Sequence, residues 1–284
     1  MGEIPTLSDY AIRSDFLVYW TGKDLDQAHE PDWATRPYRA ATERTRNRPI
    51  VQQYLDRLKN ILTYGLWLTE ADDELWVQGS AFPIPRTPKA CFTELKLSES
   101  RRHSIAYGRL GIGVKRPYIV NRHGRPLAYY WRQQGSFHDP LLQACANDLS
   151  DKSLLNFFKP MNSGAPLNYD LYSECEWRIL FRESLLRDGL LVDPRDPNND
   201  REHGYYLSLS AEQQGKLKFL SPLDGWFALI IYPNLAIKNA AQWDESVGIR
   251  DAIKRIKLDN SDHANAVEGG NWPAEMDLNS LRHF

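Results

Sequence analysis

Cysteine is scarce in this chain, which has three: Cys91, Cys145 and Cys175. They are widely spaced, and no two of them form a Cys-x-x-Cys pair. An odd and scattered set indicates neither a disulfide framework nor a zinc site. We therefore expect three buried free thiols in a reducing compartment, with a reactive cysteine as the alternative.

Long apolar runs are also missing. The longest, Trp226–Tyr232, has the length of a strand, far short of the roughly 20 residues that cross a bilayer. The first residues, MGEIPTLSDY, lack the basic and apolar regions of a signal peptide. These two absences lead us to expect a cytoplasmic protein without membrane contact.

Familiar catalytic and metal-binding motifs are absent as well. The chain contains no P-loop, HExxH or GxSxG sequence and no acidic pair with obvious metal-ligand spacing, so we predict no metal site. The net charge of −2 gives no reason to expect a general nucleic-acid-binding surface.

The chain does contain enough apolar material for a large core. Its 284 residues are 42% hydrophobic and 12% aromatic, which argues against disorder. The end of the chain is polar by comparison. We predict a single α+β domain over residues 1–258 and a polar, loosely held C-terminal tail over 259–284.

Helical and strand patterns follow one another irregularly. Apolar residues from Ile50 to Leu62 recur at steps of three and four between Pro49 and Gly65, which predicts a helix. Further helices are expected at 98–107, 140–147, 153–158 and 249–256, strands at 15–20, 75–78, 90–93, 112–120, 126–131, 176–182, 204–209 and 226–232, and polar loops at 26–49, 160–170 and 193–203. This order does not suit a doubly wound parallel sheet. It favours the α+β class, with a mixed or antiparallel central sheet and flanking helices.

The segment Glu174-Cys175-Glu176-Trp177-Arg178 is the clearest candidate site. Side chains two apart in a strand share a face, so Glu174, Glu176 and Arg178 lie together and Trp177 lies on the core side. The charged face either meets water as an ordinary ion pair or lines a cleft. In a cleft, one carboxylate could be oriented by Arg178 while the other bonds a substrate hydroxyl.

A second candidate is the predicted helix that carries His103 and Tyr107 on one face. Such a pair could bind a polar ligand or transfer a proton, although a structural histidine is the plainer alternative. Gly108, Gly111 and Gly113 follow, but they precede a strand instead of joining a strand to a helix. They therefore predict a turn or a close backbone approach and not a dinucleotide fingerprint.

Basic residues gather between positions 101 and 132. They could face phosphates, including those of nucleic acid, or they could be ordinary solvated charges. The residues are Arg101, Arg102, Arg109, Lys115, Arg116, Arg122, Arg125 and Arg132.

Several short motifs occur in an order that resembles a known family. They are Cys91-Phe-Thr-Glu-Leu-Lys-Leu-Ser-Glu-Ser100, His103, Tyr107-Gly108, Gly111-Ile-Gly-Val-Lys-Arg116, Arg125-Pro126 with Tyr129-Tyr130, and Glu174-Cys-Glu-Trp-Arg178. Over residues 15–235 the series resembles the AbiGi family of bacterial abortive-infection (phage-resistance) proteins. That family is usually described as the antitoxin half of a two-gene system. The resemblance implies a bacterial defence protein whose partner is a cognate toxin or another component of the defence system.

A weaker likeness, at the level of architecture, is to ADP-ribosyltransferases. A strand ending Tyr19-Trp-Thr21 and a helix Leu58-Lys-Asn-Ile-Leu62 leading to Gly65-Leu66 are similar to the opening of that fold. The resemblance implies a split central sheet and NAD as substrate, with a strand glutamate at the nicotinamide ribose. A carboxylate there stabilises the oxocarbenium character that develops as nicotinamide departs.

This likeness also implies roles for particular residues. Glu176 becomes the catalytic candidate and Glu174 the group that orients the acceptor, with Arg178 and His103 in support. The candidates for contact with NAD are Tyr19, Thr21, Glu94 and Tyr107. The first strand departs from the pattern, because Tyr19 and Trp20 stand where histidine or arginine is common.

Three functions follow as hypotheses. The first is a defence-associated, ADP-ribosyltransferase-like enzyme that modifies a macromolecular target. The second is a non-catalytic antitoxin that binds its toxin, which the many Trp and Tyr residues favour because aromatics concentrate at interface centres. The third is a nucleic-acid-binding protein that acts through the basic stretch.

Overall fold

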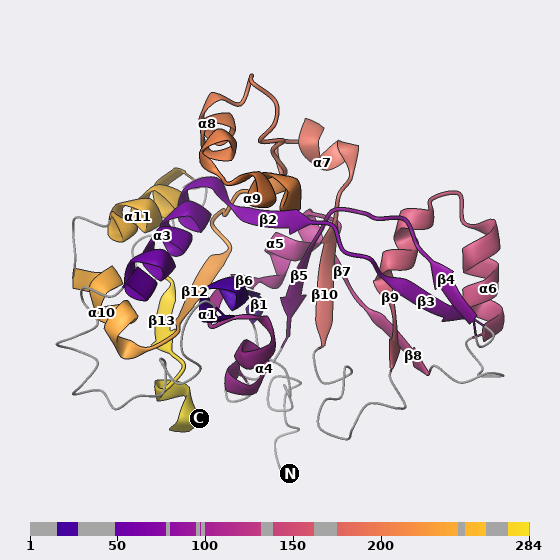
Figure 1. Ribbon diagram of the computed structural model, residues 1–284, viewed down its shortest axis with the longest axis horizontal. Coiled ribbons are helices and arrows are strands. Elements are labelled where there is room, and N and C mark those ends of the chain that lie inside the picture. Colours follow the sequence, from indigo (N-terminus) through magenta and orange to yellow (C-terminus); the bar gives the residue numbers. More distant parts are fainter. Residues whose placement is uncertain are drawn as a thin grey trace, which may run out of the picture.

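The computed structural model consists of a large mixed sheet with flanking helices and a smaller lobe beside it (Figure 1). This arrangement confirms the predicted α+β class. The structure describes residues 16–27, 49–77, 80–94, 97, 100–131, 139–161, 175–243, 248–259 and 272–283. Most of the predicted 26–49 loop, the 162–170 part of the next predicted loop, the expected helix cap Ser98 and the candidate Glu174 lie outside these residues.

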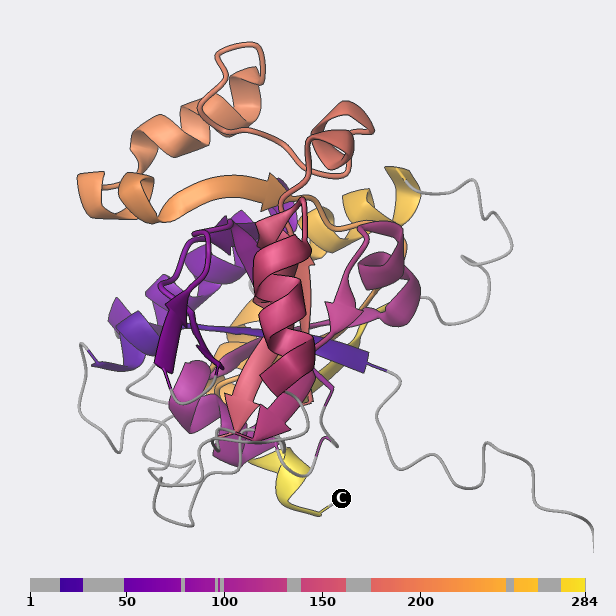
Figure 2. The same cartoon turned by 90° about the vertical axis from the view of Figure 1, so that its right-hand side faces the viewer.

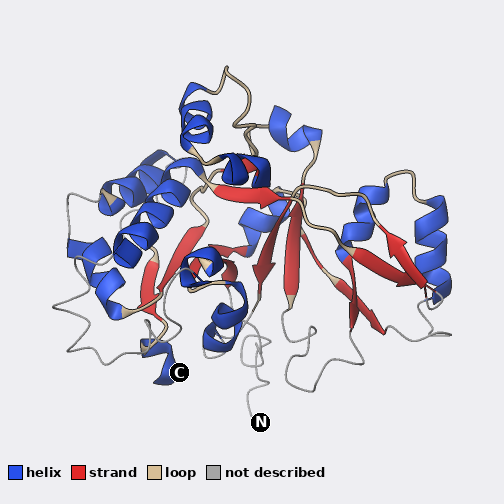
Figure 3. Ribbon diagram, viewed as in Figure 1, coloured by secondary structure: helices blue, strands red, loops and turns tan. Residues whose placement is uncertain are grey.

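Helices and strands both make up the molecule (Figure 3), and they follow one another along the chain without a simple repeat. The first half contains β1 (Phe16–Thr21), α1 (Lys23–Gln27), α3 (Pro49–Tyr64), β2 (Leu66–Thr69), β3 (Glu74–Val77), β4 (Ser80–Pro83), β5 (Lys89–Thr93), α4 (Ser100–Tyr107), β6 (Leu110–Lys115), α5 (Arg116–Asn121), β7 (Arg125–Pro126) and β8 (Ala128–Trp131). The second half contains α6 (Asp139–Asp148), the 3₁₀ helix η3 (Lys152–Phe157), β9 (Phe158–Met161), β10 (Glu176–Leu180), α7 (Glu183–Arg187), α8 (Asp200–Ser208), α9 (Ala211–Lys216), β11 (Leu217–Ser221), β12 (Phe227–Tyr232), α10 (Leu235–Trp243), α11 (Ile249–Asp259), β13 (Ala274–Asp277) and the 3₁₀ helix η7 (Ser280–His283).

The main sheet has nine strands among the described residues, in the order β11-β2-β5-β1-β6-β12-β13, with β10 and then β7 added beside β5. All of its pairs are antiparallel except the parallel pair of β12 and β13. The sheet is therefore mixed, as its predicted class requires.

The sheet carries a separate apolar cluster on each face. In β12, Ile230 and Tyr232 join the larger cluster with α3, α10 and α11, whereas Leu229 and Ile231 pack with Val18 and Trp20 on the other side. This alternation follows from the two-residue period of a strand. The helices α3, α10 and α11 gather against one face of the sheet (Figure 1).

Gly113 on β6 allows Leu229 of the smaller apolar cluster to pack closely against the backbone. A Cβ atom built on Gly113 would lie 2.5 Å from the Cβ of Leu229, so only glycine allows β6 and its neighbour to pack here. Gly108, at a φ of 112°, makes a similar backbone approach to Thr21. These glycines confirm the predicted close approach of the backbone.

The sheet diverges where β5 meets β1 and β2. β5 pairs with β1 only at Val18↔Thr93 and with β2 only at Thr69↔Lys89. Between these two pairs β1 and β2 separate along the same edge of β5. On its opposite edge, β5 pairs with β10 over its whole length, from Glu176↔Thr93 to Leu180↔Lys89.

A small lobe lies to one side of the main sheet (Figures 1 and 2). We use this name for β3, β4, β8, α6, η3 and β9, which share a core of their own around Leu75, Ile84, Tyr130, Leu142 and Leu155. Its strands form two two-stranded sheets, one antiparallel and one parallel. Tyr130 ties them together, because the backbone N–H of Trp76 donates to its hydroxyl at 2.7 Å.

Two predicted strands are wrong in part or whole. The strand expected at 112–120 ends at Lys115, and α5 follows because a proline in its first turn favours a helical start. The strand expected at 204–209 is helix α8, which begins at Asp200 inside the expected loop. Asp200 and Glu202 suit the first turn of a helix, and Tyr205 stacks on Tyr64 at a centroid distance of 4.2 Å.

The predicted loose tail is also wrong over the part that the structure describes. Residues 274–277 form β13, which pairs with β12 from Leu229↔Ala274 to Tyr232↔Asp277. Glu275 holds this strand in place: its carboxylate accepts hydrogen bonds from Tyr232, Gln242 and Trp272 and pairs with Arg250. The polar composition of this segment did not predict a strand. In the structure the strand forms because its polar side chains bond to polar partners nearby.

Replacing Glu275 with alanine is expected to lower the free energy of unfolding by about 1–3 kcal/mol, because its donors, the buried Tyr232 among them, lose their common acceptor. Urea unfolding followed by circular dichroism measures this loss. The control is Glu212→Ala, since the Glu212 side chain is 77% exposed and pairs with the exposed Lys216. An equal loss in both variants would contradict the role given to Glu275.

No helix within the described part of the chain is long and apolar enough to cross a membrane.

Candidate functional site

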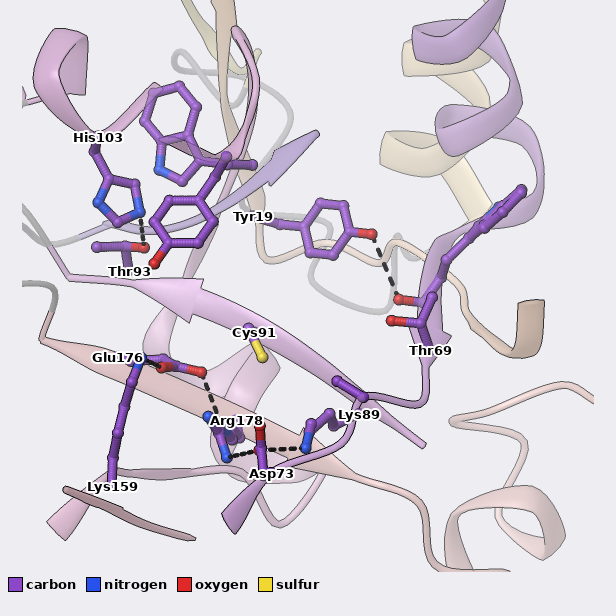
Figure 4. Close-up of a pocket in the computed structure, with 14 residues that line it drawn as sticks. Tyr19, Thr69, Asp73, Lys89, Cys91, Thr93, His103, Lys159, Glu176 and Arg178 are labelled. Carbon is purple, nitrogen blue, oxygen red and sulfur yellow. Dashed lines mark hydrogen bonds and ion pairs between the residues drawn. The ribbon is translucent and has the colours of Figure 1, made fainter. Parts of the chain in front are cut away.

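A pocket of about 330 Å³ opens where β1 and β2 separate along β5. It lies on the face of the sheet opposite to α3, and α4 and the small lobe supply the rest of its wall. The lining residues are Tyr19, Trp20, Trp67, Thr69, Ala71, Asp73, Lys89, Cys91, Thr93, His103, Tyr107, Lys159, Glu176 and Arg178. Charged groups lie along one side and aromatic groups along the other (Figure 4).

Glu176 is the central acidic group of the charged side. Its Oε1 accepts from Arg178 Nε at 2.7 Å, and its Oε2 accepts from Lys159 Nζ at 2.7 Å. Burial alone would raise the pKa of this carboxyl, but the charges of Arg178 and then Lys159 outweigh it and lower the pKa to about 2. Glu176 is therefore a buried, ionised carboxylate at neutral pH.

Arg178 and Lys89 extend the charged side beyond Glu176. Arg178 Nη1 donates to Asp73 Oδ2 at 2.9 Å and to the carbonyl of Asn156 at 2.7 Å. Lys89 Nζ donates to Asp73 Oδ2 at 2.5 Å and to Asn156 Oδ1 at 2.9 Å. Three cationic side chains and two carboxylates thus alternate along the wall, which leaves a net positive charge.

The opposite side of the pocket is aromatic. The ring of His103 stacks on Tyr107 at a centroid distance of 4.5 Å and contacts Trp20 at 5.9 Å. His103 Nε2 lies 2.8 Å from Thr93 Oγ1, and Thr93 is the cross-strand partner of Glu176. The helix α4 therefore holds His103 beside β5, the strand that pairs with the one carrying Glu176.

Tyr19 bridges the separation between β1 and β2. Its hydroxyl donates to the carbonyl of Trp67 at 3.5 Å, and its ring packs on Phe92 at 5.9 Å. Burial raises the pKa of the Tyr19 phenol to about 12, so the hydroxyl remains a donor at neutral pH. Tyr19 gives the pocket an aromatic inner wall between its charged and aromatic sides (Figure 4).

Cys91 lies on the pocket wall between Lys89 and Thr93. Its side chain is exposed to the pocket, but it lies deep within the surrounding protein. This burial, followed by the negative charge of Glu176, raises the pKa of the thiol to about 12. Cys91 is therefore a thiol and not a nucleophilic thiolate at neutral pH. The expectation of three buried cysteines is wrong, because Cys91 is exposed to the pocket and Cys145 and Cys175 are half-buried.

Alkylation of Cys91 by iodoacetamide at neutral pH is expected to be at least ~10-fold slower in the folded protein than in the urea-unfolded chain, because the reagent attacks the thiolate. Mass spectrometry of the Cys91 peptide gives both rates. Glu176→Gln should raise the folded rate, since it removes the charge that opposes thiol ionisation. Equal rates in the folded and unfolded chains would contradict the raised pKa.

The remaining predicted site residues lie elsewhere. Thr21 Oγ1 accepts from Arg57 Nη1 at 3.1 Å and does not line the pocket. Glu94 accepts from Trp177 Nε1 at 2.9 Å, pairs with Arg116, and lines a neighbouring pocket of about 310 Å³. Glu176 lines both pockets. The structure thus brings together Tyr19, His103, Tyr107, Glu176 and Arg178, but not Thr21 or Glu94.

The basic stretch does not form a uniform cationic surface. Arg109 lies 3.5 Å from Asp26, Arg116 pairs with Glu94, and the buried Arg122 pairs with Asp224 at 2.9 Å. Local carboxylates therefore balance these charges, and Arg122 is internal. Arg132 and the side chain of Arg102 lie outside the described residues.

Sequence reasoning missed the cations and the acid that complete the pocket. Lys89, Cys91 and Thr93 share one face of β5, and that two-residue period could have been recognised from the sequence. Asp73 and Lys159 are far away along the chain and reach Glu176 and Arg178 only because the small lobe folds against β10. Among the described residues, no group of three or more histidine, cysteine or acidic side chains is placed to hold a metal ion.

The arrangement suits a ligand that combines a planar ring with an anionic group. Arg178, Lys89 and Lys159 supply positive charge at one side, and the aromatic side chains supply flat apolar surface at the other. Comparison with known proteins finds no match to this chain among protein-family models, curated proteins or solved structures.

Proposed function

We propose that this pocket binds NAD and that the protein is an ADP-ribosyltransferase-like enzyme of bacterial defence. The observation that carries the proposal is the ionised carboxylate of Glu176 in a pocket at the divergence of the central sheet. The separation of β1 and β2 along β5 is consistent with the split sheet expected of such enzymes.

The charge of the pocket supports a dinucleotide ligand. The cationic side chains outnumber the carboxylates on its wall by three to two, so a diphosphate can be held by charge-assisted hydrogen bonds. Tyr19, Trp20 and Tyr107 offer aromatic surface for a planar base. A volume of about 330 Å³ lies within the range of small-molecule sites.

Glu176 supports the proposed reaction chemically. Departure of nicotinamide breaks the glycosidic bond, whose electron pair leaves with the nicotinamide nitrogen, and positive charge develops on the ribose. A fixed carboxylate stabilises that charge without having to reorganise. Arg178 and Lys159 keep Glu176 ionised, and the acceptor nucleophile then completes the transfer to the ribose carbon.

The decisive experiment incubates the purified protein with NAD labelled on the adenylate, alone and with bacterial extract. Release of nicotinamide and transfer of label to a macromolecule are the expected results. Their absence from both incubations would contradict the proposal. The antitoxin hypothesis predicts that absence, together with toxicity of the neighbouring gene when it is expressed alone.

A further inference from the structure

Glu176 stands at the contact between two separately packed parts of the molecule. β10 belongs to the main sheet, where Ile179 joins the large apolar cluster. The small lobe is built on a different apolar cluster. In Figure 4, Lys159 and Asp73 approach Glu176 and Arg178 from elements of the small lobe or directly next to it.

The small lobe and its connection hold Glu176 by its backbone as well as its side chain. The N–H of Glu176 donates to the hydroxyl of Tyr129 on β8 at 2.9 Å. Its carbonyl accepts from the N–H of Leu127, just before β8, at 2.9 Å. Lys159 on β9 donates to Oε2. The small lobe and its connection therefore fix the backbone N–H, the backbone carbonyl and the carboxylate of Glu176.

The second support of Glu176 is itself anchored to the small lobe. Arg178 donates to Glu176 from the same strand, and its guanidinium is held by Asp73, next to β3, and by the carbonyl of Asn156 in η3. Movement of the lobe would therefore disturb both cations that face the carboxylate. Since the two cations keep Glu176 ionised and oriented, the lobe controls its charge and its direction.

We propose that the small lobe positions Glu176 for reaction, with Lys159 as the positioning residue, so that the site is complete only while the lobe is seated against β10. The catalytic part of this inference rests on the proposed function, whereas the control of Glu176 by the lobe does not. Within the described part of the chain, the charged and titratable groups that face Glu176 are Lys159 on β9, Arg178 on β10, Cys91 on β5 and Tyr129 on β8, with Asp73 acting through Arg178.

The test replaces Lys159 with methionine, which keeps most of the aliphatic length and removes the charge. Carbon NMR of ¹³C-labelled glutamate carboxyls follows Glu176 as the pH is lowered, with the signal assigned by its loss in Glu176→Gln. In Lys159→Met the titration midpoint of Glu176 should rise by about 1–2 pH units, since one of two nearby cations is gone. Lys159→Arg should restore it.

A second measurement follows the steady-state kinetics of nicotinamide release from NAD. A positioning role predicts that Lys159→Met lowers kcat by roughly 10- to 100-fold and raises KM for NAD by a smaller factor, because misplacement of a catalytic group affects the transition state more than the loss of one of three pocket cations affects binding. A rise in KM alone would overturn the positioning role in favour of direct contact with NAD.

The matched control is Lys152→Met, since Lys152 belongs to the same lobe but bonds the carbonyl of Ala146. It should leave both the midpoint and kcat unchanged. An unchanged Glu176 midpoint in Lys159→Met, or the same shift in Lys152→Met, would overturn the inference. A shifted midpoint without any turnover in the wild type would refute the proposed function while supporting control by the lobe.

Discussion

Glu176→Gln is expected to lower kcat for nicotinamide release by about 10²–10³-fold, the usual cost of removing one fixed electrostatic partner of a transition state. Glutamine has nearly the same shape, but it carries no charge, and its single amide oxygen can replace only one of the two carboxylate oxygens that accept from Arg178 and Lys159. KM for NAD should change little, because positive charge on the ribose develops mainly as the bond breaks. Steady-state kinetics with nicotinamide detection measures both constants.

The control for this change is Glu183→Gln, which removes the same charge from an exposed position on α7. Its kcat should equal that of the wild type. Circular dichroism establishes that Glu176→Gln keeps the fold, because loss of a buried ion pair also affects stability. A folded Glu176→Gln variant with full activity would remove Glu176 from the mechanism.

Local patterns predicted elements with a clear apolar period, such as α3 and β10, but not the core elements β2, β11 and α10. The three-and-four spacing from Ile50 to Leu62 is α3 in the structure, and Gly65, at a φ of 108°, ends it as expected. The alternating strand that begins at Glu176 is β10. In both cases the apolar period follows directly from burial on one face, so sequence alone suffices.

Other elements depend on distant contacts and could not be predicted in the same way. The aromatic residues of α8 predicted a strand, but in the structure Tyr205 lies in a helix and its ring stacks on Tyr64. β13 reads as part of a polar tail, yet it is held by Glu275 and by its pairing with β12. Tertiary partners override local preference at these positions.

Part of the site was predictable from the sequence, and the side chains that the small lobe adds to it were not. Strand periodicity placed Glu176 and Arg178 on one face, and helical spacing placed His103 beside Tyr107. Asp73 and Lys159 come from segments without a motif. They pair with Arg178 and Glu176 only because the small lobe packs against β10. The sequence therefore placed Arg178 beside Glu176 but did not indicate Lys159 or Asp73.

Arg178→Met is expected to lower the free energy of unfolding by about 3–5 kcal/mol, the largest effect on stability that we predict. The side chains of Arg178 and Glu176 are only 6% and 8% exposed. Methionine fills most of the volume but leaves Glu176 with Lys159 as its remaining cationic partner, and Asp73 with Lys89. Equilibrium urea unfolding measures the change, and Arg187→Met is the control because the Arg187 side chain is 78% exposed.

The double variant Arg178→Met/Glu176→Gln separates the ion pair from simple packing. If the cost of Arg178→Met comes from an uncompensated buried carboxylate, neutralising Glu176 should make the double variant more stable than Arg178→Met by ~1 kcal/mol or more. If the cost comes from lost packing around Arg178, the two losses should add. Additive losses, or a loss below about 1 kcal/mol in Arg178→Met, would show that the pair is not the buried electrostatic anchor that its geometry indicates.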